Sequence, residues 1–236
     1  YGAHYTTWAA RAFAQGETAL GRDLVKRAVV FDPSILEGER CPLLLELLHT
    51  SIADEDADHE AAFSAMVGQL PEGFELVSAA RDWAVAYGYL LKGTRAVTWG
   101  RTAPGREALV KARSMGAVSD RAYFQTVVHQ VLSYEVEFGV GAARTVTRDL
   151  AESLVEAGLL DRAGRLEAEC LMGQAFRDHA AGQPGRVPGK VIKAFAKDPG
   201  WLANRGAHSI LARSVLGVLT GRRGGEGKAS RQQGAA

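Results

Sequence analysis

The sequence has few of the residues that build covalently stabilised or metal-stabilised folds. Its 236 residues include two cysteines, Cys41 and Cys170, which is too few for a disulfide framework or a cysteine-based metal site. Each lies among apolar residues, and we expect each to be a small core residue. This cysteine usage fits a reducing compartment, and we predict a cytoplasmic location.

Long apolar runs and strand patterns are also lacking. No run approaches the roughly 18–20 apolar residues that a helix needs to cross a bilayer, so we predict no transmembrane segment. No segment alternates β-branched and polar residues between turn signals in the way that half-buried strands do. The sequence therefore predicts an all-α protein.

The chain as a whole carries no excess of one charge. Its net charge is +1, which excludes a molecule built throughout as a polyanion binder, and we expect no nucleic-acid partner. The distribution is uneven, because from Arg177 to the end eleven Lys and Arg face three Asp and Glu. We interpret residues 220–236 as a disordered basic tail. Peripheral contact of this basic end with a membrane surface is the alternative.

The motifs of common enzyme classes are missing. There is no phosphate-binding loop, no zinc-binding pair of histidines at helical spacing, and no strand–turn–helix glycine pattern for a dinucleotide. Asp54-Glu55-Asp56, near His59, formally matches a metal-binding Asp-X-Asp motif. That motif needs a strand end beside a nucleotide, whereas this run lies between two predicted helices, so we interpret it as helix capping and solvation. We predict no catalytic residue, metal or cofactor in this chain.

The chain does contain one pattern of eight residues that occurs twice. Eight residues recur 166 positions later; the first copy is Ala9, Ala14, Gly16, Val25, Ala28, Asp32, Pro33 and Leu36. In each copy a glycine is expected to end one helix and an Asp-Pro pair to end the next. This spacing predicts a helical hairpin near each end of the chain.

Between the copies the sequence predicts further helices. We expect one over 76–91 that is closed by Gly93, and one over 106–115 that begins after a break at Pro104-Gly105. Two longer helices, over 120–138 and 142–157, are expected on either side of a Gly139–Gly141 turn. A terminal helix is expected over 202–219.

Aromatic and basic side chains are the candidates for binding. The aromatic residues that could line a groove for a peptide or a glycan are Tyr5, Trp8, Trp83, Tyr87 and Trp201. At helical spacing such residues are also typical of a core, and this alternative stays open. Arg205 and Arg213 on the terminal helix could contact acidic lipids or a partner domain, or simply form a solvated polar face.

The skeleton Ala9, Gly16, Ala28 and Asp32-Pro33 resembles a tetratricopeptide repeat, which has small residues in both helices, a glycine at the turn and a closing proline. The resemblance is good only in the two terminal copies. It implies antiparallel helix pairs stacked as an irregular tetratricopeptide-like α-solenoid over residues 1–219.

A second resemblance is broader. Asp198-Pro199-Gly200-Trp201 and the residues up to Ser214 are similar to the closing segment of certain bacterial family 2 glycosyltransferases. The Ala-rich opening helix, the acidic run before Phe63 and Leu70-Pro71 are similar as well, so the resemblance spans most of residues 1–217. It implies a tetratricopeptide-like region that follows a catalytic domain. That domain would hold the catalytic residues, so none is transferred to this chain.

Three hypotheses follow. In the first, the chain is a non-catalytic scaffold or interaction domain of a glycosyltransferase that moves a sugar from a nucleotide-sugar donor to an acceptor. Its partner would be its own upstream catalytic domain, since the chain begins with Tyr1 rather than Met. In the second, it is a free-standing peptide- or protein-binding scaffold. In the third, it is a helical enzyme with an unrecognised site.

Overall fold

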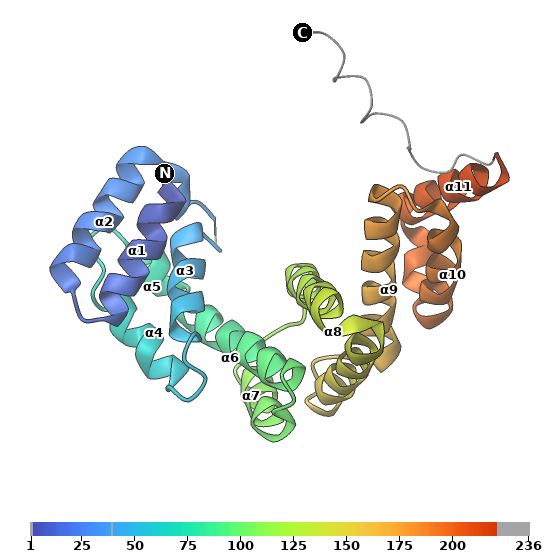
Figure 1. Cartoon of the computed structure of the whole chain (residues 1–236). Coiled ribbons are helices and arrows are strands. Elements are labelled where there is room, and N and C mark those ends of the chain that lie inside the picture. Colours follow the sequence, from blue (N-terminus) through green and yellow to red (C-terminus); the bar gives the residue numbers. More distant parts are fainter. Residues whose placement is uncertain (1, 39, 221–236) are drawn as a thin grey trace, which may run out of the picture. The chain divides into compact units, whose positions relative to one another are not determined.

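The structure is a computed structural model that describes residues 2–38 and 40–220 (Figure 1). Within these residues the chain forms eleven α-helices and three short 3-10 helices, and it has no strand. The predicted all-α class is therefore confirmed. The predicted tail over 220–236 lies outside the described residues, apart from Thr220.

The chain divides into two compact units. The N-unit consists of residues 1–118 and 156–159, and the C-unit of residues 119–155 and 160–236. The N-unit holds helices α1 to α7, whose bounds are α1 Gly2–Ala14, α2 Thr18–Phe31, η1 Pro33–Leu36, α3 Pro42–Ser51, α4 His59–Val67, α5 Glu75–Ala79, α6 Arg81–Thr98 and α7 Thr102–Ser114. The C-unit holds α8 Arg121–Glu156 up to residue 155, α9 Ala163–Ala180, η2 Pro184–Arg186, α10 Val187–Lys197, η3 Pro199–Ala203 and α11 Arg205–Leu219.

The first copy of the repeated pattern forms the hairpin α1–α2. Gly16 ends α1 with φ of +78°, in the left-handed region that favours glycine. The amide of Gly16 donates to the carbonyl of Phe13 at 3.1 Å, and the amide of Glu17 donates to that of Ala12 at 2.8 Å. This pair of hydrogen bonds is a Schellman motif. After α2, the Asp32 carboxylate accepts from the amide of Ser34 at 3.1 Å and so caps η1.

The second copy forms the hairpin α9–α10 with the same local geometry. Gly182 has φ of +67°, and its amide and that of Gln183 donate to the carbonyls of His179 and Asp178 at 3.1 and 2.9 Å. The Asp198 carboxylate accepts from the amide of Gly200 at 3.1 Å and caps η3. The small residues at the helix crossings are fully buried in both hairpins; they are Ala9, Ala28, Ala175 and Ala194. The predicted hairpins are therefore present, one in each unit.

The core of the N-unit is built on α3, which packs against α1, α4 and α6. Its apolar face is completely buried and consists of Leu43, Leu44, Leu47 and Leu48. On α4 the fully buried ring of His59 places Nδ1 2.7 Å from Ser51 Oγ and Nε2 3.2 Å from the carbonyl oxygen of Val85. A Cβ on Gly88 would lie 1.9 Å from His59 Nε2, so α6 can approach α4 here only because Gly88 has no side chain.

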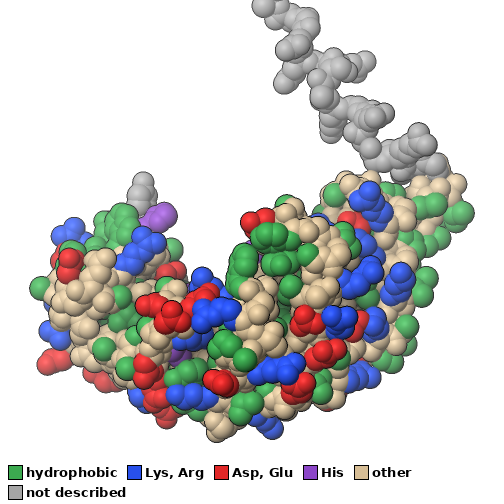
Figure 2. Space-filling view, turned by 60° about the horizontal axis from the view of Figure 1, so that its bottom comes forward, with side chains coloured by type: hydrophobic (Ala, Val, Ile, Leu, Met, Phe, Trp, Pro, Cys, Tyr) green, Lys and Arg blue, Asp and Glu red, His purple; other side chains and the backbone are tan. Residues whose placement is uncertain are grey.

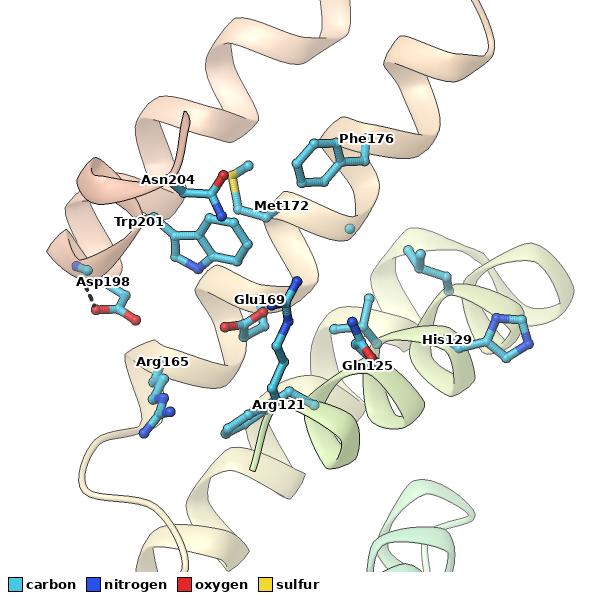
Figure 3. A pocket seen from close by; sticks show the side chains of 15 residues that line it. Arg121, Gln125, His129, Arg165, Glu169, Met172, Phe176, Asp198, Trp201 and Asn204 are labelled. Atoms are coloured by element: carbon cyan, nitrogen blue, oxygen red, sulfur yellow. Dashed lines mark hydrogen bonds between the residues drawn. The ribbon is translucent and has the colours of Figure 1, made fainter. Parts of the chain in front are cut away.

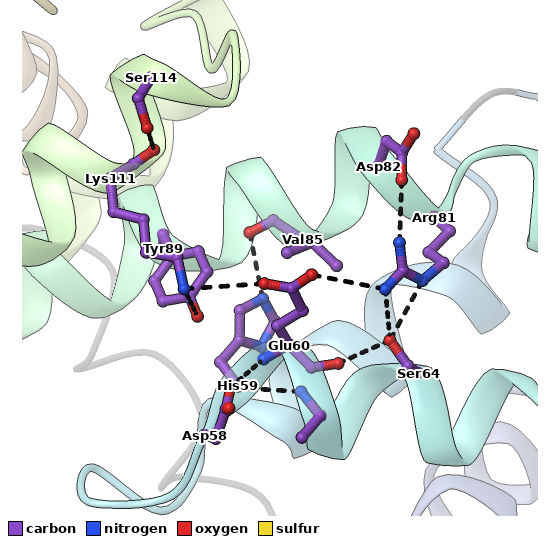
Figure 4. A network of polar contacts seen from close by, with 11 residues as sticks. Asp58, His59, Glu60, Ser64, Arg81, Asp82, Val85, Tyr89, Lys111 and Ser114 are labelled. Atoms are coloured by element: carbon purple, nitrogen blue, oxygen red, sulfur yellow. Dashed lines mark hydrogen bonds and ion pairs between the residues drawn. The ribbon is translucent and has the colours of Figure 1, made fainter.

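A polar network joins α4, α6 and α7 at the surface of the N-unit (Figure 4). The Glu60 carboxylate lies 3.5 Å from the Arg81 guanidinium and 3.6 Å from the Lys111 ammonium group. Arg81 also donates to Ser64 Oγ at 2.8 and 3.1 Å. Lys111 donates to the Tyr89 hydroxyl at 2.5 Å, and this hydrogen bond is the main cause of the raised pKa of Lys111.

Three helix boundaries in the N-unit differ from the prediction. The predicted helix over 76–91 is two helices, α5 and α6, that meet at Ala80. Gly93 does not close α6 but lies inside it, where a Cβ would be 2.8 Å from the carbonyl oxygen of Gly105 on α7. Gly93 and Gly105 thus allow α6 and α7 to cross closely. In the sequence alone, a glycine at such a crossing looks the same as a glycine that ends a helix. Pro104 is in the first turn of α7 rather than before it, where its missing amide hydrogen costs nothing.

In the C-unit, α8 changes direction at Gly139, whose φ of 85° and ψ of 165° are not helical. This kink confirms the turn predicted between the two long helices. The first half of α8 approaches α9 closely, because a Cβ on Gly173 would lie 2.4 Å from Val128 Cγ1. The apolar core joins α9, α10 and α11 and includes Met172, Val187, Val191 and Ile210. In contrast to α3, the helix α11 packs mainly against α10 and η2.

No helix among the described residues combines the length and apolar character needed to span a bilayer. In the space-filling view of Figure 2, Lys and Arg side chains, in blue, are scattered over the part that carries the C-terminal helices.

Candidate functional site

The two hairpins differ in what lies on their first helix. Ala10 on α1 and Ile35 in η1 are 0% and 1% exposed, in a unit whose next helix, α3, packs against both α1 and η1. The residues 166 positions later are Phe176 and Trp201. Phe176 is 39% exposed and Trp201 is half-buried. In the described part of the C-unit the following helix, α11, packs mainly against α10 and η2 and only partly against α9 and η3, and the corresponding surface borders a cavity.

The cavity has a volume of about 790 Å³ and lies between the first half of α8, α9 and η3 (Figure 3). Its apolar wall contains three aromatic residues, Phe124, Phe176 and Trp201, with Val128, Leu132 and Met172. Its polar lining carries both charges and neutral hydrogen-bonding groups, and consists of Arg121, Gln125, His129, Arg165, Glu169, Asp198 and Asn204. Aromatic faces beside a few convergent polar groups are typical of small-ligand sites.

The charged residues of the cavity are not all neutralised in the same way. Asp198 pairs with Arg162 at 2.6 Å and caps η3, so its carboxylate is already satisfied. Burial raises the pKa of Glu169, while the positive charges of Arg165 and Arg121 act in the opposite direction. In Figure 3 the Arg121 side chain, from α8, extends toward Glu169 on α9. Desolvation is thus the larger effect on Glu169, whose carboxyl group makes no hydrogen bond within the described residues.

Several polar groups of the lining have no hydrogen-bonding partner within the described part of the chain. They are the side chains of Arg121, Gln125, His129, Glu169 and Trp201. Asn204 is different, because its Oδ1 accepts from the amide of Ala207 at 3.1 Å and caps α11. Arg165 places its guanidinium carbon 4.9 Å from the centre of the Phe124 ring. The cavity thus offers donors and acceptors that a ligand could use.

The binding residues predicted from sequence fall into separate groups. Tyr5 and Trp8 lie on α1 with ring centres 5.6 Å apart, and Tyr5 stacks on Phe31 of α2 at 5.4 Å. Trp83 and Tyr87 stack at 5.1 Å on α6, with Arg40 4.8 Å from the centre of the Trp83 ring.

The remaining predicted binding residues are in the C-unit. Trp201 lines the cavity, whereas Arg205 and Arg213 are exposed on α11 and do not line it. The structure therefore pairs Tyr5 with Trp8 and Trp83 with Tyr87. Of the seven residues, Trp201 lines the cavity between α8, α9 and η3. Their role in binding stays a prediction.

Sequence reasoning missed Arg121, Arg165 and Glu169. Arg165 and Glu169 are separated by one helical turn on α9, and such a pair reads as a solvated helix face. Only the approach of α8 at Gly173 turns that face into the wall of a cavity. The contact between Val128 and Gly173, which are 45 positions apart, left no local signal in the sequence.

The acidic run makes ion pairs. Glu55 pairs with Arg101 and lies 3.4 Å from Arg95, and Asp56 lies 3.3 Å from Arg101. The cap of α4 is Asp58, whose carboxylate accepts from the amides of Glu60 and Ala61. Among the described residues no three His, Cys, Asp or Glu side chains are grouped as metal ligands.

Two serine–histidine contacts also occur, and both serines are inaccessible. Ser51 and Ser214 are 4% and 1% exposed, and their hydroxyls lie 2.7 and 3.4 Å from His59 and His179. Burial raises the pKa of the Cys170 thiol to about 12, so it is a neutral thiol rather than an activated nucleophile. The described geometry therefore supports binding better than covalent chemistry.

Comparison with known proteins adds no family. No family model matches the chain, and neither curated proteins nor solved structures gave a significant match.

Proposed function

We propose that this chain is a non-catalytic helical binding region and that the cavity between α8, α9 and η3 is its ligand site. The observation that carries the proposal is the uncovered surface of the second hairpin. There Trp201 and Phe176 stand beside polar groups that have no partner among the described residues. The corresponding residues of the N-unit, Ala10 and Ile35, are buried in a unit where α3 packs against α1 and η1. In the C-unit the aromatic side chains at these positions stay partly exposed to water, which is unfavourable unless they have a binding role.

The chemistry of the cavity favours a neutral polar ligand with flat apolar faces. The lining carries two arginines and two carboxyl groups, so its formal net charge is zero and it does not select a strongly charged molecule. Trp201 offers a ring face, and Gln125, Glu169 and Arg121 offer acceptors and donors around it. Sugar rings combine apolar faces with outward hydroxyl groups, and a short glycan therefore fits this lining best.

This chemistry agrees with the resemblance to the helical regions of family 2 glycosyltransferases. In this proposal the parent enzyme transfers a sugar from a nucleotide-sugar donor, and the helical region holds the acceptor near an upstream catalytic domain. The stacked hairpins would form a tetratricopeptide-like α-solenoid, and the parent enzyme would act in the cytoplasm. The basic end of the chain would contact that catalytic domain or a membrane surface.

The test is titration of the chain with short oligosaccharides, followed by tryptophan fluorescence and calorimetry. A panel of β-linked and α-linked glucose and N-acetylglucosamine trisaccharides covers the common ring geometries. We expect at least one to bind, and Trp201→Ala to weaken that binding about tenfold, since stacking on an aromatic ring contributes on the order of 1 kcal/mol or more. Trp99→Ala, at an exposed tryptophan of the N-unit, is the matched control. A panel that does not bind, or an equal loss in both variants, would contradict the site.

The second candidate is a peptide-binding scaffold with no link to sugar transfer. Arg121 and Arg165 favour it, because both line the cavity and could pair with the carboxylate of a peptide C-terminus. Titration with tripeptides that have a free or an amidated C-terminus separates the two ligands. Preference for the free carboxylate, lost in Arg121→Gln, would favour the peptide.

Catalysis by the chain itself is tested by a sugar-nucleotide hydrolysis and transfer assay. We expect no turnover. Turnover that Asp56→Ala abolishes would overturn the interpretation of the acidic run as a set of ion pairs.

A further inference from the structure

A second cavity of the C-unit lies on another side of α9. It has a volume of about 470 Å³ and is bordered by α8, mainly its second half, and by α9 and α10. Its apolar floor includes Val131, Ala143, Cys170 and Leu171, and its polar lining consists of Arg144, Thr145, Thr147, Arg148, Glu167, Gln174, Lys193 and Lys197. Four cations thus stand around one carboxylate.

The four cations form two pairs of like charge. Arg144 and Arg148 are four residues apart on α8, and Lys193 and Lys197 are four residues apart on α10. Like charges at this spacing lie on one helix face and destabilise the helix. The stability of the fold alone therefore does not explain why two pairs of like charge border one cavity.

Only one member of each pair is neutralised within the described residues. Lys197 pairs with Glu167, and Arg148 lies 3.2 Å from the carboxylate of its neighbour Asp149. Arg144 and Lys193 have no ion-pair partner in the described part of the chain. One cation from α8 and one from α10 are therefore left for an anion from outside the protein.

The floor of this cavity can add little charge of its own. Cys170 is a neutral thiol, Thr147 donates its hydroxyl to the carbonyl of Ala143 at 2.8 Å, and Val131 is 1% exposed. An anion bound here would meet cations at the rim and apolar groups below. Inorganic phosphate would leave the accessible apolar side chains of the lining, Val140 and Leu171, in contact with water, whereas an organic phosphate would cover them.

We propose that this cavity binds an organic phosphate, with the phosphoryl group held by Arg144 and Lys193 and the organic part on Val140 and Leu171. A phosphate monoester carries close to two negative charges at neutral pH, which matches the two unpaired cations. The planar guanidinium of Arg144 can bind two phosphate oxygens at once, and the ammonium group of Lys193 acts as a compact second charge. This site is separate from the glycan cavity and does not depend on it.

The test uses octyl phosphate as the soluble probe, and octanol and inorganic phosphate as its two halves. Calorimetry of the full chain at low ionic strength should show octyl phosphate binding more tightly than either half. The double variant Arg144→Gln with Lys193→Gln should weaken binding about tenfold or more, because two charge-assisted contacts are lost. Added salt should weaken binding in the natural chain. Equal affinity of the natural chain and the double variant would overturn the proposal.

A matched double variant controls for net charge. Lys26→Gln with Arg186→Gln removes two exposed cations elsewhere and should leave the affinity for octyl phosphate unchanged. An equal loss of affinity in this control would mean that binding depends only on the net positive charge, and it would overturn the proposal. Without ligand, the cavity variant should melt no lower than the natural chain, since its like-charge repulsion is relieved. A marked fall in its melting temperature would mean that these cations stabilise the fold, which contradicts the argument.

The source of the phosphate is separated by a vesicle experiment. Sedimentation with phosphatidylcholine vesicles that contain phosphatidic acid tests a lipid headgroup. Binding that the cavity variant abolishes assigns a lipid phosphate, and binding of octyl phosphate without sedimentation assigns a free metabolite; both support the site. If neither octyl phosphate nor the vesicles bind, the site is wrong.

Discussion

The hairpins α1–α2 and α9–α10 share a turn, an Asp-Pro stop and buried alanines at their crossings, yet they have different surroundings. In the N-unit the next helix, α3, lies on α1 and η1 and buries Ala10 and Ile35. In the C-unit the next helix, α11, lies mainly on α10 and η2 and covers α9 and η3 only in part, so Phe176 and Trp201 also border a cavity. The comparison teaches that a repeated sequence can determine the geometry of a helical hairpin. The segment that follows the hairpin then determines whether the hairpin surface is buried in the core or lines a cavity.

The strongest way to break this comparison is to exchange the side chains at one position. Ala10→Phe places the residue of the C-unit into a fully buried position of the N-unit, and we expect it to lower the free energy of unfolding by about 3 kcal/mol through overpacking. The reverse change, Phe176→Ala, removes a partly exposed ring and should cost about 1 kcal/mol or less. Urea denaturation followed by circular dichroism measures both. Similar losses in the two variants would mean that the two surfaces are equally covered.

Two glycines sharpen the contrast between a buried helix crossing in the N-unit and an exposed helix face in the C-unit. Gly88→Ala forces a Cβ against His59 Nε2 and should destabilise the protein by about 2–3 kcal/mol. Gly189→Ala, on α10, meets no atom within 4 Å and should stabilise its helix by up to about 1 kcal/mol. A melting temperature of Gly88→Ala that does not fall would refute the packing described for α4 and α6.

The turns are where the two hairpins should behave alike. Gly16→Val and Gly182→Val each put a β-branched residue at positive φ, and each should cost about 1.5 kcal/mol. Because both turns have the same pair of hydrogen bonds, the two losses should agree closely. Unchanged melting of both variants would argue against the turns, and a large difference between them would show that the copies are not equivalent.

Acid should destabilise the N-unit through His59. Burial lowers the pKa of this ring in the folded state, so the unfolded chain takes up the proton more readily. The contribution is therefore fully present above the ordinary pKa near 6.5 and decreases as the pH falls below it. Between pH 7.5 and pH 5 the natural chain should lose more of its free energy of unfolding than His59→Gln. Parallel pH profiles from urea denaturation would show that His59 is not the titrating group.

Local signals in the sequence predicted much of this fold. Gly16, Gly182 and the two Asp-Pro pairs predicted both hairpins, and Gly139 predicted the kink in α8. The prediction that Gly93 ends a helix was wrong, because a glycine inside a close helix crossing and a glycine at a helix end look alike without the partner helix. The cavity could not be predicted, since it depends on the approach of Val128 to Gly173 and on which side of the hairpin α11 packs. Trp201 was found as an aromatic residue, but its neighbours Arg121 and Glu169 were not.

Native thiol labelling tests the central claim, that one hairpin surface is sealed and its counterpart is open. Cys41 and Cys170 are both buried and give a slow background. Ala10→Cys and Phe176→Cys place a thiol at corresponding positions of α1 and α9, and a disulfide reagent reports the rate at which each reacts. The account predicts that Phe176→Cys reacts nearly as fast as an unfolded thiol and that Ala10→Cys reacts only as fast as the protein opens. Comparable rates for the two thiols under native conditions would contradict it.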